Sequence, residues 1–377
     1  MLNKKVYFNI RPTSRERMWD TVKYANEVCE VLLPKGVKQQ SSVETYKTYH
    51  QSFLTPIKYV LTKKIINRQK VDMQEVKNAD LIYIWGSSKP RNSSLSYIVE
   101  LDNPYSTSYY HIDNFHKNYS KIKSNLKEAY KITYLSEASK NHTIELFGKE
   151  FESKSYVTYP YMNENYKNNR RSDDTINFIF VGLNMKGKGG EEVLEAFYNT
   201  KVENIRLTFI SNVGEDIKIK YINDTRIKIL PPQSREILFN EIYPKMDVMI
   251  FPSLYESFGV VLLEALSFGM GIITVNVYAT PEIVQNNYNG KLLHHPIFKP
   301  TILNGKEIVN CVDTIIQDFH QRYISHGEFY YGLYSELISA INEATYNYKN
   351  WQINSLELFE SKFSPSIWTN NIKKIME

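Results

Sequence analysis

Short apolar runs alternate with helix-length amphipathic segments along the whole chain. The runs are rich in Val, Ile, Tyr and Phe and are bounded by polar or turn-forming residues, a pattern that predicts buried strands. Ten strands are predicted in two groups: first Lys5–Ile10, Asp80–Trp85, Ser96–Leu101, Lys131–Leu135 and Tyr156–Tyr159, then Asn177–Val181, Arg206–Ile210, Arg226–Leu230, Asp247–Phe251 and Gly271–Val275. Strands separated by helix-length segments indicate parallel βαβ units.

The polar segment Asn163–Asp174, which lacks apolar periodicity, separates the two groups and is the predicted linker. A chain of 377 residues is long for one hydrophobic core. We therefore expect an α/β protein with two Rossmann-like, doubly wound domains, residues 1–170 and 171–363. In such folds, ligands bind at the carboxyl ends of the strands. One further helix is expected around Ile308–Tyr323.

The composition, 42% hydrophobic and 23% charged, is that of a soluble globular protein. Two distant cysteines, Cys29 and Cys311, exclude a disulfide scaffold and a cysteine-only zinc site. The start of the chain lacks an apolar signal core, and the most apolar stretch, Phe258–Val277, carries Glu264 and three glycines. A cytoplasmic protein without a membrane span is expected.

Charge is unevenly distributed between the two groups. Residues 1–170 carry 27 basic and 17 acidic side chains, whereas the whole chain has a net charge of only +5. One basic cluster comprises Lys58, Lys63, Lys64, Arg68 and Lys70; the other comprises Lys117, Lys121, Lys123, Lys127 and Lys131, interleaved with Phe115, Tyr119, Ile122 and Leu126. This pattern predicts an anionic partner, such as a membrane surface; the alternative is a solvated lysine-rich face. No nucleic-acid-binding module is recognisable, so that partner class ranks last.

Two strand-to-helix turns have the chemistry of phosphate sites. Arg11-Pro12-Thr13-Ser14 follows the first strand, and Thr13 with Glu16 has the spacing of a capping box. The segment from Gly182 to Gly190 combines glycines with Lys186 and Lys188 before a helix that begins near Glu191. Free backbone N–H groups at a helix start, together with lysines, suit a phosphate, although glycines also form ordinary tight turns.

Two glutamates flank the start of a predicted helix at Gly259–Phe268. Glu256 precedes the helix and Glu264 lies within it, so about 12 Å separates the two carboxylates along a helix axis. They cannot share one metal, but they can contact opposite ends of an extended ligand, with the N–H groups of Phe258 and Gly259 between them. The alternative is that Glu264 is a surface residue and Glu256 only caps the helix.

This stretch resembles the E-x7-E motif of retaining GT-B glycosyltransferases of the family 4 type. Further segments are similar to other motifs of the family: Phe180-Val181-Gly182 with Lys188-Gly189, Tyr243–Ser253, Pro281-Glu282-Ile283-Val284, Asn289–Leu293 and, more weakly, Ile132–Gly148. The resemblance implies two domains that face a central cleft, with a C-terminal helix at about 364–377 packing back on the N-terminal domain.

The resemblance also implies roles for individual residues. Glu264 would hold the ribose of a nucleotide sugar, and Glu256 with Phe258 and Gly259 would hold the donor sugar. Lys188, beside Gly182, would bind the diphosphate. The base would lie near Leu230. The family is usually metal-independent, so neither a metal nor a cofactor is expected.

The chain departs from the family pattern at three places. Leu183 stands where the family has an arginine, and Lys186 could replace its charge. Arg11 or Arg15 could supply a phosphate contact where the family has a Gly-Gly loop. The family's active-site histidine has no obvious counterpart; Asp102 or, alternatively, His111 could take its place. Glu100 and Asp102 are candidates to position or polarise the acceptor hydroxyl, or else are ordinary strand-end residues.

The expected function is thus metal-independent retaining transfer of a hexose from a nucleotide-diphosphate sugar to a hydroxyl acceptor. The acceptor is expected to be a glycan or lipid-linked glycan of the cell envelope, as in polysaccharide biosynthesis, with peripheral attachment to the inner membrane face. Two alternatives stay open. One is another enzyme on this scaffold, such as a nucleotide-sugar epimerase or a sugar phosphorylase. The other is a non-catalytic sugar- or nucleotide-binding scaffold subunit.

Overall fold

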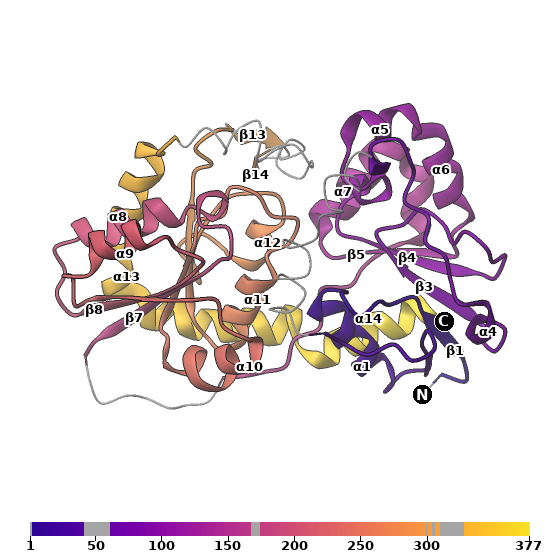
Figure 1. Ribbon diagram of the computed structural model, residues 1–377, viewed down its shortest axis with the longest axis horizontal. Helices are drawn as coiled ribbons and strands as arrows, with labels where there is room; N and C mark the ends of the chain where they lie inside the picture. The colour runs from indigo at the N-terminus through magenta and orange to yellow at the C-terminus, as the bar shows by residue number, and fades with distance from the viewer. Residues whose placement is uncertain (1, 41–60, 167–173, 299, 304–305, 310–327) are drawn as a thin grey trace. The chain divides into compact units, whose positions relative to one another are not determined.

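The computed structural model describes residues 2–40, 61–166, 174–298, 300–303, 306–309 and 328–377 (Figure 1). The chain forms two compact units. Unit 1 comprises the described residues between Met1 and Tyr161 together with Phe363–Glu377, and unit 2 comprises the described residues between Met162 and Lys362. Each unit is built on a parallel six-stranded sheet. The expected α/β class with two Rossmann-like sheets is confirmed.

Unit 1 has the strand order β2-β1-β3-β4-β5-β6. Its strands are β1 (Lys5–Phe8), β2 (Glu30–Leu32), β3 (Leu81–Trp85), β4 (Tyr97–Leu101), β5 (Lys131–Tyr134) and β6 (Ser155–Val157). Its helices are α1 (Glu16–Ala25), α4 (Met73–Val76), α5 (Ile112–Lys117), α6 (Tyr119–Glu128), α7 (Glu137–Phe147) and α14 (Pro365–Met376). The central strands β3 and β4 are buried along their whole length, and their residues are apolar except for Glu100.

Unit 2 has the strand order β12-β11-β10-β7-β8-β9. Its strands are β7 (Ile176–Val181), β8 (Ile205–Ile210), β9 (Ile227–Leu230), β10 (Val248–Phe251), β11 (Gly271–Val275) and β12 (Gly290–Leu293), with an antiparallel pair β13 (Pro300–Leu303) and β14 (Lys306–Val309). Its helices are α8 (Gly190–Asn199), α9 (Glu215–Tyr221), α10 (Arg235–Ile237), α11 (Val260–Ser267), α12 (Thr280–Ile283) and α13 (Tyr331–Leu358).

The C-terminal helix α14 completes the core of unit 1, as expected. Trp368, Ile372, Ile375 and Met376 are buried among side chains of β1, β3 and α1. Lys4 donates to the carbonyl oxygens of Met376 and Glu377 at 2.7 and 2.6 Å, so both ends of the described chain meet in this unit. The first and last segments of the sequence therefore form one hydrophobic core.

All ten predicted strands are present, with bounds that differ by a few residues. Two local predictions differ from the structure. The capping box is absent: α1 begins at Glu16 without a side-chain cap, and Ser14 instead accepts from the N–H of Arg11 at 3.0 Å. The helix expected at Ile308–Tyr323 begins inside β14, and its remainder lies outside the described residues. The predicted linker lies partly outside them too.

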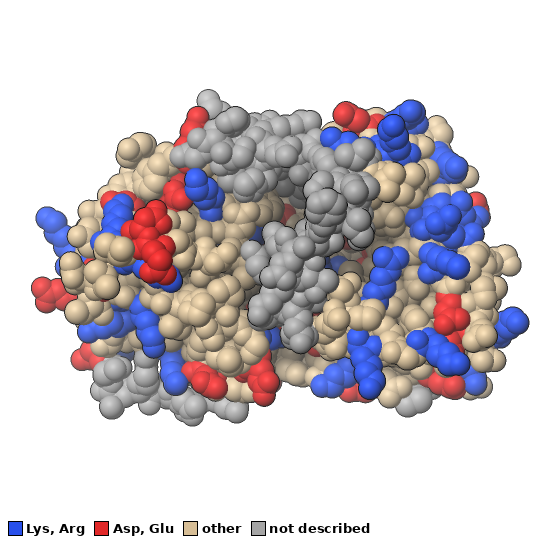
Figure 2. Space-filling view, viewed as in Figure 1, with Lys and Arg blue, Asp and Glu red and all other residues tan. Residues whose placement is uncertain are grey.

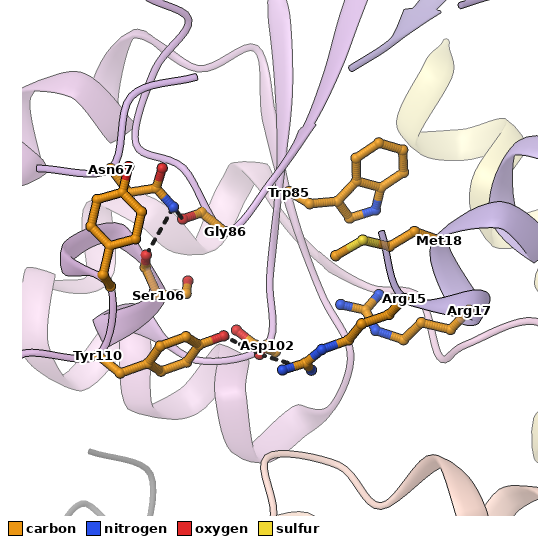
Figure 3. A pocket seen from close by; sticks show the side chains of 10 residues that line it. Arg15, Arg17, Met18, Asn67, Trp85, Gly86, Asp102, Ser106 and Tyr110 are labelled. Carbon is orange, nitrogen blue, oxygen red and sulfur yellow. Dashed lines mark hydrogen bonds and ion pairs between the residues drawn. The ribbon is translucent and has the colours of Figure 1, made fainter. Parts of the chain in front are cut away.

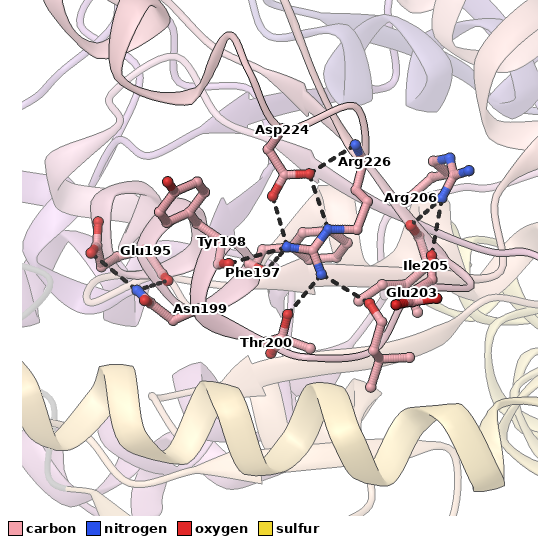
Figure 4. A network of polar contacts seen from close by, with 11 residues as sticks. Glu195, Phe197, Tyr198, Asn199, Thr200, Glu203, Ile205, Arg206, Asp224 and Arg226 are labelled. Carbon is pink, nitrogen blue, oxygen red and sulfur yellow. Dashed lines mark hydrogen bonds and ion pairs between the residues drawn. The ribbon is translucent and has the colours of Figure 1, made fainter.

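The end of α8 is fixed by an arginine (Figure 4). Arg226, at the start of β9, donates to the carbonyl oxygens of Thr200 at 2.7 Å and Val202 at 2.9 Å, and its guanidinium forms an ion pair with Asp224 at 2.7 Å. Further contacts reach the carbonyl of Tyr198. Because the last carbonyls of a helix lack partners within it, this guanidinium satisfies groups that would otherwise be unpaired.

Candidate active site

The glycine-rich segment between β7 and α8 is a compact turn against the loop after β10. Gly189 has a φ of +68°, and a Cβ there would lie 2.7 Å from the carbonyl oxygen of Pro252, so only glycine fits. Gly182 donates its N–H to Ile210 O at 3.0 Å, which extends the β7–β8 pairing into the turn. The turn therefore holds Lys188 at the carboxyl edge of the sheet, where α/β folds bind ligands.

The structure brings two of the predicted residues, Lys188 and Glu256, into direct contact. Lys188 Nζ lies 2.5 Å from Glu256 Oε1 and donates to the carbonyl of Tyr255 at 3.2 Å. The ammonium also lies 4.2 Å from the centre of the Tyr255 ring. Both side chains of the pair are more than four-fifths buried, with 16% and 18% exposed. A cation and a carboxylate are thus held side by side with little solvent to screen them.

Glu264 lies on α11 and has partners that the sequence did not suggest. Tyr243 donates its hydroxyl to Glu264 Oε2 at 3.1 Å, and Arg235 Nε lies 3.5 Å from Glu264 Oε1. The Arg235 guanidinium also packs over the Phe239 ring at 4.7 Å. Glu264 is therefore not a freely solvated surface residue, because only 12% of its side chain is exposed.

Sequence reasoning missed Arg235, which follows the helix-capping Ser234. The Ser234 hydroxyl accepts from the Ile237 N–H at 3.3 Å, which fixes the start of α10 shortly after β9. Arg235 could have been identified from two signals. It follows a capping serine, and it stands near the strand end where the base of the nucleotide was expected to lie.

The remaining predicted donor residues differ in backbone conformation and exposure. Gly259 has a φ of +89° at the start of α11, a conformation that residues with side chains rarely adopt. Phe258 beside it is buried. Leu230 ends β9 half-buried, whereas Lys186 is exposed in the turn. Leu183, which stands where the family pattern has an arginine, is also exposed, at 44%.

Glu100 of unit 1 has both carboxylate oxygens engaged inside the protein. Arg17 donates to Oε1 and the Tyr83 hydroxyl donates to Oε2 at 2.6 Å. Only 4% of the Glu100 side chain is exposed. Beside this carboxylate, burial raises the pKa of Tyr83. This pairing supports a structural role for Glu100, which ties α1 to the sheet, rather than contact with an acceptor.

Asp102 lies two residues farther along the chain, just after β4, in the wall of a pocket of about 140 Å³ (Figure 3). It accepts from the Tyr110 hydroxyl at 2.7 Å and from the Asn103 N–H at 3.0 Å. Arg15 lies 3.7 Å away, at the start of α1. Asp102 is therefore the predicted acceptor-side residue that reaches a cavity.

The two other candidates of unit 1 are placed differently. Arg11 is exposed in the loop after β1. His111, the alternative to Asp102, is buried, and its Nε2 lies 3.1 Å from the Thr62 hydroxyl. These contacts give His111 a role at the start of α5 and not at a solvent-facing site.

Residues 162–301 match the family model described as "Glycosyl transferases group 1". These residues include the glycine-rich turn, Lys188, Glu256 and Glu264. Over this range the chain is similar to the group 1 glycosyl transferase family. A comparison with curated protein sequences gave no match.

Solved structures of glycosyltransferases share the fold of the whole chain. HepE from Anabaena, in complex with UDP-glucose, matches with a TM-score of 0.61 at 15% identity over 99% of each chain. Sucrose-phosphate synthase from Thermosynechococcus elongatus matches with a TM-score of 0.63 at 13% identity, over 99% of this chain and 98% of that one. The lipopolysaccharide outer core galactosyltransferase WaaB gives 0.58 at 13%, over 99% of each chain. These likenesses confirm the GT-B fold.

Among the described residues, no three His, Cys, Asp or Glu side chains converge in a way that could hold a metal ion. In the same part of the chain, no helix combines the length and apolar character needed to cross a membrane.

Proposed function

We propose that this protein transfers a hexose from a nucleotide-diphosphate sugar to a hydroxyl acceptor with retention of anomeric configuration. The contact between Lys188 and Glu256 carries the proposal. A diphosphate needs a cation and backbone N–H groups, whereas a sugar needs carboxylate acceptors for its hydroxyls. The turn after β7 supplies the first set and the segment 256–259 supplies the second.

In the proposed reaction, the bond between the anomeric carbon and the diphosphate oxygen breaks. Negative charge then develops on the departing diphosphate, where Lys188 would stabilise it. The acceptor oxygen forms its bond to the anomeric carbon on the same face, and its proton passes to a phosphate oxygen. This route needs no protein nucleophile. Glu264, with Arg235 beside it, would bind the ribose.

The acceptor side of the proposal rests on Asp102 and its pocket in unit 1. A carboxylate that accepts from Tyr110 can also accept from an acceptor hydroxyl and orient it. A glycan or lipid-linked glycan of the cell envelope is the proposed acceptor class, which would place the protein in the cytoplasm, at the inner membrane face.

A membrane surface is the proposed additional partner. On the face drawn in Figure 2, lysines and arginines gather over unit 1. Phe115, Ile122 and Leu126, however, are fully buried, so α5 and α6 turn their apolar residues inward and offer no apolar face to a bilayer. Any attraction is then purely electrostatic.

The proposal is tested by donor hydrolysis and binding with the purified chain. UDP-glucose and other nucleotide sugars are compared, and release of nucleotide diphosphate is measured with and without glycan acceptors. Slow hydrolysis of one donor, abolished in Lys188→Ala, supports a transferase. Tight nucleotide binding without any turnover favours the non-catalytic scaffold, for which the exposed Leu183 is the supporting observation.

A further inference from the structure

His295 links the end of β12 to the loop that carries Glu256. Its Nε2 lies 2.9 Å from the carbonyl oxygen of Leu254, which comes two residues before Glu256. The histidine stands two residues after the end of β12, and β12, β11 and β10 are neighbours in the sheet. Because these strands are parallel, their carboxyl ends lie at one edge, where the loop after β10 also begins.

The partners of the two ring nitrogens determine the protonation state of His295. Nδ1 faces the N–H groups of Ile297 at 3.2 Å and Phe298 at 3.1 Å, so it accepts and carries no proton. The ring proton is therefore on Nε2, which donates it to the Leu254 carbonyl. Burial lowers the pKa of His295, which favours this neutral form at neutral pH. With only 5% of the residue exposed, the ring is held in one orientation from both sides.

Leu254 relays this contact to the pair formed by Lys188 and Glu256. Its N–H donates to the carbonyl of Gly187, the residue before Lys188, at 3.1 Å. Its own carbonyl accepts from His295. The backbone of one fully buried residue is therefore fixed on one side by the glycine-rich turn and on the other by the segment after β12.

The residues on either side of Leu254 extend this arrangement. Ser253, also fully buried, donates its hydroxyl to the Tyr255 carbonyl at 2.9 Å. The same carbonyl accepts from Lys188 Nζ at 3.2 Å, and the Tyr255 hydroxyl accepts from Asn184 Nδ2 at 3.3 Å. The Leu254 carbonyl belongs to the planar peptide group that joins Leu254 to Tyr255. A rotation of that group would displace Tyr255 and, with it, an acceptor that holds Lys188.

We infer that His295 is a positioning residue of the donor site: its Nε2–H group fixes the Leu254 carbonyl and thereby keeps Lys188 and Glu256 in the arrangement that the reaction needs. In this role His295 touches neither the substrate nor the reacting atoms. The role rests on the proposed function, because that function is what makes the arrangement of the two charged side chains important.

Two substitutions separate the two sets of hydrogen bonds of the ring. In His295→Gln, the amide nitrogen of the side chain extends about as far as Nε2 and can still donate to Leu254. In His295→Asn, the shorter side chain places its oxygen near the position of Nδ1. There it can accept from Ile297 and Phe298, but the side chain no longer reaches Leu254.

Steady-state kinetics on the full chain with the preferred donor gives the first measurement. We expect His295→Asn to lower kcat roughly 10–100-fold and to change KM less, since a misplacement of about 1 Å near the reacting groups can cost ~10²-fold. His295→Gln should retain most of the activity. The matched control is His294→Asn, because the His294 side chain is 70% exposed and pairs with Glu336 at 3.0 Å. It should leave kcat and KM unchanged.

Hydrogen exchange of single amides tests the same contact without relying on turnover. In His295→Asn, the Leu254 amide should exchange faster, because the backbone around it is no longer held on both sides. The amides of Ile297 and Phe298 should keep their rates. His295→Gln should show the reverse pattern, and His294→Asn should show neither change.

Equal losses of kcat in the two His295 variants, an unchanged kcat in His295→Asn, or an unchanged exchange rate of the Leu254 amide in that variant would each overturn the inference. Loss of the folded state in His295→Asn, measured by urea unfolding, would do the same, since the histidine would then be structural. A chain that turns over no nucleotide sugar would contradict the proposed function instead. The exchange rates would then still decide whether His295 holds the loop.

Discussion

Lys188 Nζ lies 2.5 Å from Glu256 Oε1, so the cation proposed to bind the diphosphate is already paired with the carboxylate proposed to bind the sugar. The pair joins the turn after β7 to the loop after β10. Each side chain fixes the position of the other before a ligand arrives, which is the preorganisation that electrostatic catalysis requires.

Replacing Lys188 with alanine should reduce turnover by ~10²–10³-fold, the usual effect of losing one preorganised group that stabilises developing charge. The loss should appear in kcat more than in KM, because the charge on the departing diphosphate develops in the transition state. Steady-state kinetics with the preferred donor measures both. Lys201→Ala, an exposed lysine just after α8, is the control. A larger loss in Lys186→Ala than in Lys188→Ala would transfer the role to Lys186.

Replacing Glu264 with alanine should weaken nucleotide diphosphate binding by ~1–3 kcal/mol, because Arg235, Tyr243 and the ribose hydroxyls would lose a buried partner. Calorimetry with UDP, or with whichever nucleotide binds, measures the change. Glu241→Ala removes an exposed carboxylate nearby in the sequence and should have no effect. Unchanged affinity in a folded Glu264→Ala protein would exclude the ribose role.

Replacing Glu192 with glutamine should stabilise the protein at neutral pH. Glu192 is 3% exposed on α8, and burial raises its pKa, although it accepts from the Tyr330 N–H at 3.0 Å. A carboxyl whose pKa is higher in the folded state contributes stability that is complete below its unfolded pKa and is lost as the pH rises through the folded pKa. The glutamine keeps the acceptor without the charge. Urea unfolding at several pH values should show that the Glu192→Gln protein has a higher free energy of unfolding than the unaltered protein at pH 7 and the same free energy at pH 4. An advantage independent of pH would contradict this explanation.

Replacing Arg226 with alanine should lower the free energy of unfolding of unit 2 by ~2–4 kcal/mol, since several carbonyls at the end of α8 and Asp224 would lose their partner. The Arg226 side chain holds the pKa of Asp224 below its ordinary value, so this contribution should fade as the pH falls into the acidic range. Arg206 is the control in the same region (Figure 4), because it is exposed and bonds only to two neighbouring carbonyls. Arg206→Ala should cost less than ~0.5 kcal/mol.

Binding to anionic vesicles should depend on Lys117 and Lys121. Both are exposed, whereas Lys123 and Lys127 share an ion pair with Glu150, at 2.9 and 3.4 Å, that lowers the pKa of Glu150 to about 2. Each lysine near an anionic surface contributes ~1 kcal/mol, so the double change of Lys117 and Lys121 to glutamate should abolish cosedimentation at physiological salt. Lys77→Glu is the control. Equal sedimentation with neutral lipid would show that the lysines are simply solvated.

The fold was largely predictable from the sequence because buried parallel strands form apolar runs. Such runs can be recognised without knowing which elements pack against them. Among the described residues, four strands escaped prediction, and each has at most four residues: β2, β12, β13 and β14. The site was predictable only in part. Glu256, Lys188 and Glu264 could be identified because they stand at the spacing of a known motif. The roles of Arg235 and Glu100 could not, because they depend on side-chain contacts that form only in the folded chain. Arg17 is 83 positions away from Glu100, and a single sequence gives no indication of such a pairing.

The return of α14 to unit 1 sets an order on folding during synthesis. Val6, Phe8 and Tyr83 belong to the same hydrophobic cluster as Trp368 and Ile372, which are made more than 200 residues after the last strand of that sheet. At ~5–20 residues per second, the ribosome needs roughly 10–40 s to cover that interval. During this time the N-terminal half of the protein exists with part of its core uncovered, while unit 2 already has all its strands. The nascent chain therefore passes through a stage in which unit 2 can be fully folded and unit 1 cannot. A chaperone would bind the chain at that stage.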